Sequence, residues 1–285
     1  MFDLFKKVWK IKIIESGSFK LDGGAMMGSV PKVLWNKTNP SDELNRINLS
    51  MRCLLLDNGK DVVLIETGIG NKNSQKFVDM FCIKQSSFPL KDELKKNGYN
   101  LEDITHVILT HLHFDHVGGA TYLNDQNIIP TFPNAKYVIS KTNWDTATNP
   151  NSRERASFLP ENFIPIKEHN QLVLIDDNQE IMEGINGMAF YGHTNGQQLI
   201  KITVDNNSLV FCSDLIPLKS HLRIPWVMGY DINAVKTMEE KTFFLEQASK
   251  LNWLLFFYHD PNVIAVRVKK SSKYYDITEE YNVNE

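Results

Sequence analysis

The stretch HLHFDHVGG, residues 111–119, carries four candidate metal ligands within six positions. An apolar run at 106–110 precedes it and predicts a short β-strand. The glycine pair at its end predicts a turn. A strand would therefore deliver a cluster of histidines and one carboxylate directly into a loop.

The spacing within this loop suits two metal ions. Residues two apart in an extended segment point the same way, so His111 and His113 can share one ion while Asp115 and His116 turn toward a second. Imidazole and carboxylate ligands together suit zinc, iron, manganese or cobalt, and zinc is the commonest choice for hydrolysis. The alternative is a solvated polar loop, which would require three of the chain's eight histidines to fall together by chance.

This run resembles the HxHxDH signature of the metallo-β-lactamase superfamily. Further stretches resemble other motifs of that family in the same order: ETGIG at 66–70, GHT at 192–194, SD at 213–214 and YHD at 258–260. The resemblance extends from about Leu49 to Asp260. It implies an α/β fold, the four-layer αββα metallo-β-lactamase sandwich, built as a single hydrolase domain by residues 1–285.

The same resemblance implies a complete ligand set for two divalent metal ions, most simply zinc. One ion would be held by His111, His113 and His193, the second by Asp115, His116 and His259, and both would be bridged by Asp214. Two ions roughly 3.5–4 Å apart can share a water, lower its pKa toward about 7 and present hydroxide to a substrate carbonyl. Glu66 departs from the family, which usually has Asp there, so its hydrogen bonds near the metals must follow a different geometry.

Details of the motifs favour the branch of N-acyl-homoserine-lactone lactonases and related esterases. Flavin-dependent di-iron relatives have a carboxylate at the position of His113, and zinc β-lactamases of the commonest subclass have a cysteine at that of Asp214. The stretches 213–217 and 226–231 resemble the lactonase branch. Known lactonases carry a tyrosine where this chain has Pro217. Thioester hydrolysis of the glyoxalase II type and phosphotriester hydrolysis are the alternative activities.

Three residues are candidates for moving protons: Asp115, His221 and Tyr230. Asp115 is primarily a ligand that could also steer protons. His221 lies seven residues beyond Asp214, and an imidazole with a pKa near 6.5 could protonate the leaving alkoxide. A histidine that caps a surface turn is the alternative interpretation, and Tyr230 is then the reserve donor.

The segment 23–35 is a predicted loop that combines glycine hinges with Met26, Met27 and Trp35. Flexible methionines adapt to varied apolar ligands, so this segment is predicted to contact the apolar part of a small-molecule substrate. A hydrophobic plug, or a contact between two copies in a homodimer, is the equally weighted alternative.

Composition narrows the partners and the location. A net charge of −3, with only the Lys269-Lys270 region as a basic cluster, argues against nucleic acid. No stretch approaches the roughly 20 apolar residues that span a membrane, and residues 1–16 lack the apolar core of a secretory signal. The three separated cysteines predict no disulfide framework. We therefore expect a cytoplasmic protein without membrane contact.

Patterning also predicts the elements around the motifs. Strands are expected at 8–15, 49–56, 61–65, 172–175, 188–191, 198–204, 208–212 and 253–258. Helical spacing marks 75–81, 89–96 and a helix from Asp231, as its N-cap, to about Leu251. The polar stretch 141–170 is interpreted as a helical insertion.

Overall fold

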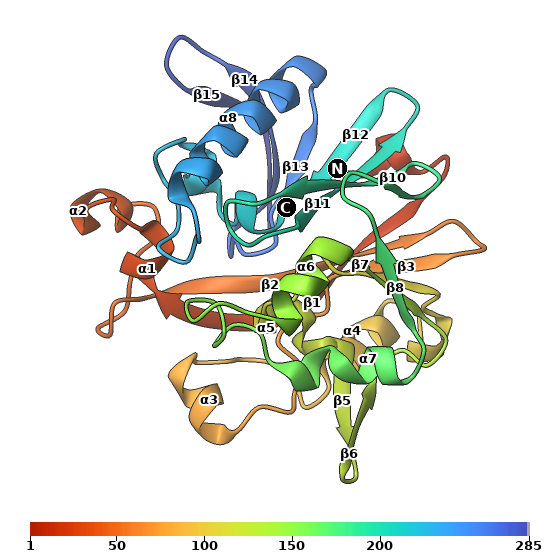
Figure 1. Ribbon diagram of the computed structural model, residues 1–285. Helices are drawn as coiled ribbons and strands as arrows, with labels where there is room; N and C mark the ends of the chain where they lie inside the picture. Colours follow the sequence, from red (N-terminus) through yellow and green to blue (C-terminus); the bar gives the residue numbers. More distant parts are fainter. Residues whose placement is uncertain (284–285) are drawn as a thin grey trace.

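A computed structural model describes residues 1–283, in which two β-sheets face each other (Figure 1). The first sheet has the order β1-β2-β3-β4-β7-β8, formed by Lys10–Asp22, Arg46–Asp57, Val62–Ile65, His106–Ile108, Lys136–Ser140 and Leu172–Ile175. The second has the order β15-β14-β13-β12-β11-β10-β9, formed by Tyr275–Asn282, Val263–Lys270, Leu254–Phe256, Asn207–Phe211, Gln197–Val204, Ile185–Phe190 and Glu180–Met182. A small hairpin pairs β5 with β6, Thr121–Asn124 and Asn127–Pro130.

Helices lie outside both sheets, which gives the expected four layers of an αββα sandwich. The long helix α8, Ala234–Leu251, covers the outer face of the second sheet, whereas the helices on the side of the first sheet include α4 and α7, Pro89–Lys96 and Ile164–Glu168 (Figure 1). The remaining α-helices are short: α1 Gly23–Met27, α2 Lys32–Trp35, α3 Gln75–Met80, α5 Phe114–Val117 and α6 Lys141–Thr148.

Alternate residues of the central strands pack into two different layers. Leu209 and Phe211 of β12 lie in the core between the sheets, whereas Val210 packs in the cluster that contains the apolar face of α8. Strand β13 repeats this pattern. Because successive side chains of a strand point to opposite faces, the continuous apolar runs found here indicate a sheet that is buried on both sides.

Strand β2 of the first sheet is hydrogen-bonded to the loop after β13 of the second sheet, at the predicted ligand His259. The backbone N–H of Ser50 donates to His259 O at 2.9 Å, and that of Arg52 donates to Tyr258 O at 3.2 Å. The buried Arg52 guanidinium also donates to Asp260 O at 2.9 Å. These bonds fix the loop after β13, and with it the backbone of His259.

The predicted strands and the helices α3, α4 and α8 are present, with shifted boundaries, but one prediction is wrong. Asp231 does not cap α8; the cap is Asn233, whose side chain accepts from Lys236 N at 3.0 Å. Asp is a preferred N-cap residue of helices, but the carboxylate of Asp231 instead contacts His193 Nδ1 at 2.9 Å. The chain therefore uses this residue near the predicted metal ligands and begins the helix later.

The apolar segment 23–35 also differs from a flexible loop. It forms α1 and α2, with Asp22 accepting from Ala25 N at 2.7 Å at the start of α1. Trp35 is buried, and its ring lies so close to Gly23 that a Cβ there would meet it at 2.5 Å. The glycine thus permits close packing here rather than acting as a hinge.

Candidate metal centre

Four loops bring the predicted ligands to one edge of the sandwich. The loop after β4 carries residues 111–116, and His193, Asp214 and His259 follow β10, β12 and β13. Each loop leaves the carboxyl end of its strand. All seven predicted ligands are buried. Six of them form the two groups described next, and Asp214 lies between these groups.

The first group consists of three histidines. His113 Nδ1 lies 3.1 Å from His111 Nε2 and 3.2 Å from His193 Nε2. These three imidazole nitrogens, which lie within 4.8 Å of one another, could hold one metal ion, and they are the set assigned to the first ion in the sequence analysis.

The second group lies beside the first. His116 Nε2 is 3.2 Å from His259 Nε2, and Asp115 Oδ2 is 3.5 Å from His259 Nε2 and 3.9 Å from His116 Nε2. Two nitrogens and one carboxylate oxygen are a donor set that zinc and other divalent transition metals accept.

Asp214 lies between the two groups and turns one oxygen toward each. Its Oδ2 is 3.3 Å from His193 Nε2 in the first group. Its Oδ1 is 3.3 Å from His259 Nε2 and 3.4 Å from His116 Nε2 in the second. The carboxylate has the position of a bridging ligand.

For two of the histidines, the partner of the ring nitrogen that points away from the centre shows which nitrogen directs its lone pair inward. His259 Nδ1 contacts the carbonyl oxygen of Ser50 at 2.9 Å, and a carbonyl can only accept, so Nδ1 carries the proton. His193 Nδ1 contacts Asp231 in the same way. The Nε2 lone pairs of both residues therefore point inward, which is the orientation that a metal ligand needs.

The pKa shifts differ among the predicted ligands. Burial lowers the pKa of His111 and of His113 well below the ordinary value, so both imidazoles are neutral and can act as ligands. Burial also lowers the pKa of His116 and of His193, but neighbouring carboxylates raise each of them by more, so the net shift of both is upward. Burial raises the pKa of Asp214, but His116 and His259 lower it by more, and the net shift is well downward. Asp214 Oδ1 is buried without a hydrogen-bond partner, which fits an oxygen reserved for a cation.

The Glu66 side chain, one methylene longer than the Asp that is usual in the family, contacts two different groups. Its Oε1 accepts from Thr110 N at 2.8 Å, and its Oε2 lies 3.6 Å from His116 Nδ1. Because His116 Nδ1 points away from Asp214, Glu66 contacts the outer nitrogen of a predicted ligand. The residue has a positive φ of 67°, so the backbone as well as the side chain adapts to this position.

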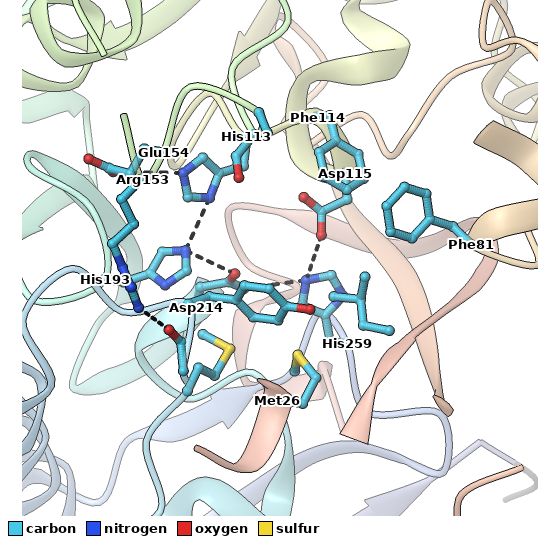
Figure 2. Close-up of a pocket in the computed structure, with 16 residues that line it drawn as sticks. Met26, Phe81, His113, Phe114, Asp115, Arg153, Glu154, His193, Asp214 and His259 are labelled. Carbon is cyan, nitrogen blue, oxygen red and sulfur yellow. Dashed lines mark hydrogen bonds and ion pairs between the residues drawn. The ribbon is translucent and has the colours of Figure 1, made fainter. Parts of the chain in front are cut away.

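A cavity of about 380 Å³ opens above the ligands (Figure 2). One part of its wall is apolar and is formed by Leu21, Met26, Phe81, Phe114 and Met228. The Phe81 and Phe114 rings pack against each other, with 5.4 Å between centroids. The size and the mixture of apolar and polar lining are those of a small-molecule site.

The three candidates for proton transfer differ in their position relative to the cavity. Asp115 and Tyr230 line it. His221 is buried outside the lining, and its Nε2 lies 2.9 Å from Met26 O. Burial, followed by the charge of Lys241, lowers the pKa of His221 to about 3, so its neutral ring has a single N–H, which it donates to that carbonyl. Of the apolar segment, Met26 lines the cavity, whereas Met27 and Trp35 are buried outside the lining.

Sequence reasoning missed two residues of the polar wall, Arg153 and Glu154. Glu154 is buried, accepts from Thr194 Oγ1 at 2.5 Å, and lies 4.0 Å from His113 Nε2. Arg153 donates to Gly229 O and Asp231 O across the cavity mouth. Both stand in the stretch interpreted as a helical insertion, where the charges of Arg153–Arg155 look like a solvated surface and no motif marks them.

Residues 51–259 match the metallo-beta-lactamase superfamily. The chain belongs to this superfamily. Among solved structures, this hydrolase is similar to a probable metal-dependent hydrolase from Staphylococcus aureus, with a TM-score of 0.86 and 30% identity over 97% of this chain and 98% of that one. Its fold is also that of AidC, a dizinc quorum-quenching lactonase in complex with a product, with a TM-score of 0.78, 22% identity and coverage of 96% and 98%.

Among curated proteins, the hydrolase is 25% identical to an N-acyl homoserine lactonase of Bacillus cereus over 76% of this chain and 83% of the relative. The predicted family, the hydrolase class and the resemblance to lactonases are thus confirmed. Within residues 1–283, no helix has the length and apolar character needed to cross a membrane.

Proposed function

We propose that this hydrolase binds two divalent metal ions, most simply zinc, and opens a lactone that carries an apolar N-acyl chain. The observation that carries the proposal is the position of Asp214 between two three-ligand groups at the base of a partly apolar cavity. The similarity of this chain to N-acyl homoserine lactonases supports the choice of substrate. A single domain, a homodimer and a cytoplasmic location remain predictions from the sequence.

Each part of the site has a separate task in this reaction. Metal ions bound here would activate water and polarise the carbonyl of the substrate. Asp214 would set the separation of the two groups, and Asp231 and Ser50 would orient His193 and His259. The aromatic wall at Phe81 and Phe114 would exclude water around the acyl chain.

Tyr230 is the proposed proton donor to the leaving alkoxide. Burial, followed by the charges of Asp22 and Asp115, raises the pKa of Tyr230 to about 12. The phenol is therefore protonated at neutral pH and can donate a hydrogen bond or a proton as negative charge develops on the leaving oxygen.

The proposal is tested by metal analysis together with a substrate panel. Protein purified without chelator is expected to contain about two equivalents of transition metal, because the two ligand groups are both complete. The panel should include N-acyl-homoserine lactones, simple esters, thioesters and phosphotriesters. The highest kcat/KM should be for a lactone. Preferred hydrolysis of a thioester or a phosphotriester would reject the lactone assignment, and only trace metal in active protein would reject the dinuclear site.

Met26 and Met27 allow a matched test of the acyl wall, because only Met26 lines the cavity although both are buried. Met26→Ser should raise KM for a long acyl chain by roughly tenfold more than for a short one, since apolar contact is lost only along the chain. Met27→Ser should lower the melting temperature without this chain-length effect. Initial rates on hexanoyl and dodecanoyl lactones measure the difference, and equal effects of Met26→Ser on both would contradict an acyl-binding role.

A further inference from the structure

The segment Arg223–Asp231 forms part of the cavity wall without being a helix or a strand. Met228, Gly229 and Tyr230 line the cavity, and Asp231 contacts the predicted ligand His193. This segment, named here the wall segment, therefore faces the substrate space at its centre and the metal centre at its end. Its conformation must be set by contacts with its neighbours.

Lys241 of α8 supplies such contacts at the start of the wall segment. The Lys241 side chain is fully buried, and its Nζ donates to Trp226 O at 2.6 Å, Arg223 O at 2.9 Å and Ile224 O at 3.4 Å. No carboxylate of residues 1–283 lies within ion-pair distance of it. A buried amine whose contacts are all with the carbonyls of one segment defines the path of that segment.

Glu240, the neighbouring residue on α8, holds the loop that carries His193. Its carboxylate oxygens accept from Tyr191 N at 2.9 Å and from Gly192 N at 3.0 Å. Gly192 is pressed against the helix, because a Cβ there would lie 2.4 Å from Thr237 Oγ1. The histidine that follows is thereby fixed relative to α8.

The two loops are also bonded to each other. Ile232 N donates to His193 O at 3.2 Å, and Asn233 N donates to Gly192 O at 2.9 Å. Together with the contact between Asp231 and His193, these bonds make the end of the wall segment continuous with the ligand loop.

We propose that Glu240 and Lys241 are a positioning pair on α8: Lys241 sets the cavity wall that the substrate contacts, and Glu240 sets the predicted metal ligand His193. Neither residue lines the cavity. The kinetic part of this inference rests on the proposed lactonase function, whereas its structural part does not. The pair would align the substrate with the metal centre by holding both loops on one helix.

The first test replaces Lys241. Lys241→Met keeps the length of the side chain but removes its donors, Lys241→Arg keeps the donors, and Lys250→Met makes the same change at an exposed site of the same helix. Burial lowers the pKa of Lys241 to about 7, so measurements belong about one unit below that value, where the amine is mostly protonated. Hydrogen exchange of the backbone amides, read by mass spectrometry, reports on the segment without any substrate.

Lys241→Met is expected to speed exchange in the wall segment at least tenfold, where the N–H groups of Trp226, Gly229 and Asp231 now make hydrogen bonds. Exchange in β12 and β13 should stay unchanged. KM for the lactone should rise several-fold more than kcat falls, metal content should remain constant, and Lys241→Arg should restore most of the loss. Lys250→Met should change none of these.

The second test separates the two members of the pair. Glu240→Gln replaces one acceptor oxygen by an amide that cannot accept from a backbone N–H. We expect metal affinity, measured by competition with a chelating dye, to fall about tenfold, in the range found for residues that support ligands. KM should change less than it does in Lys241→Met.

Some results would overturn the inference. Exchange that accelerates evenly through the protein in Lys241→Met would make Lys241 an ordinary core residue, and unchanged exchange in the wall segment would remove its role altogether. If Lys241→Met does not fold, Lys241→Gln, which retains one donor group, must show the same local pattern. A protein that hydrolyses no lactone, yet shows the exchange pattern, would refute the proposed function and leave the positioning pair intact.

Discussion

Replacing Asp214 with Ala is expected to lower kcat/KM by more than about 10³-fold and to reduce bound metal to one equivalent or less. The carboxylate turns one oxygen toward each ligand group, so its loss removes a ligand from both groups at once. It also removes a negative charge that lies within 4.0 Å of four buried histidines. Elemental analysis and initial rates on the same preparation measure the two effects together.

Asp57→Asn is the matched control for Asp214. Asp57 lies at the end of β2, which pairs antiparallel with β3, so it is at the sheet edge opposite to the ligand loops. Its carboxylate accepts hydrogen bonds from Tyr99 Oη and from Gly59 N. Metal content and kcat/KM of this control should equal those of the parent protein. An Asp214→Ala protein that keeps two metal equivalents and full activity would exclude the bridging position.

The fold could be predicted because several motifs constrain it together. The ligand run after β4 requires a strand before it, and the later motifs require three further strand ends that meet it. The apolar runs at β12 and β13 are continuous rather than alternating, as in strands that are buried on both faces. Boundaries were less accurate. The predicted strand ends at Glu15, whereas β1 continues to Asp22 past an irregularity between Glu15 and Ser18, where Gly17 has a positive φ of 129°.

The supporting residues of the site could not be predicted in the same way. In the sequence, Asp231 resembles a helix N-cap. Its contact with His193 exists only because the fold brings these two distant residues together. Glu154 and Lys241 look like surface charges in sequence, yet both are buried. Contacts between residues far apart in the chain decide these roles. Helical periodicity places Lys241 on the same face of α8 as Phe244 and Leu245, but it does not show which groups the amine contacts.

His221 illustrates the same limit. Its interval from Asp214 made it a candidate donor, but the chain turns through Lys219–Leu222 and directs the ring toward α1 instead of the cavity. A neutral imidazole has one N–H, and Met26 O already accepts it. Of the three candidates, Asp115 and Tyr230 line the cavity and His221 does not, which supports the proposal of Tyr230 as the donor.

Tyr230→Phe is expected to lower kcat roughly 10²-fold with little change in KM, which is the usual contribution of a positioned proton donor. The substitution removes only the hydroxyl, so the apolar surface and the fold should be retained, and metal content should be constant. Because the pKa of Tyr230 is raised to about 12, the phenol stays protonated across the neutral range, and its loss should lower kcat by the same factor from pH 6 to 9.

His221→Ala provides the comparison for Tyr230→Phe. It removes the bond to Met26 O and should disturb the acyl wall, so that KM for long chains rises while kcat changes by less than about threefold. The double variant should then have the kcat of Tyr230→Phe alone, because only one residue donates. A 10²-fold fall in kcat for His221→Ala, together with an unaffected Tyr230→Phe enzyme, would assign the proton to His221 and require its ring to turn toward the cavity during the reaction.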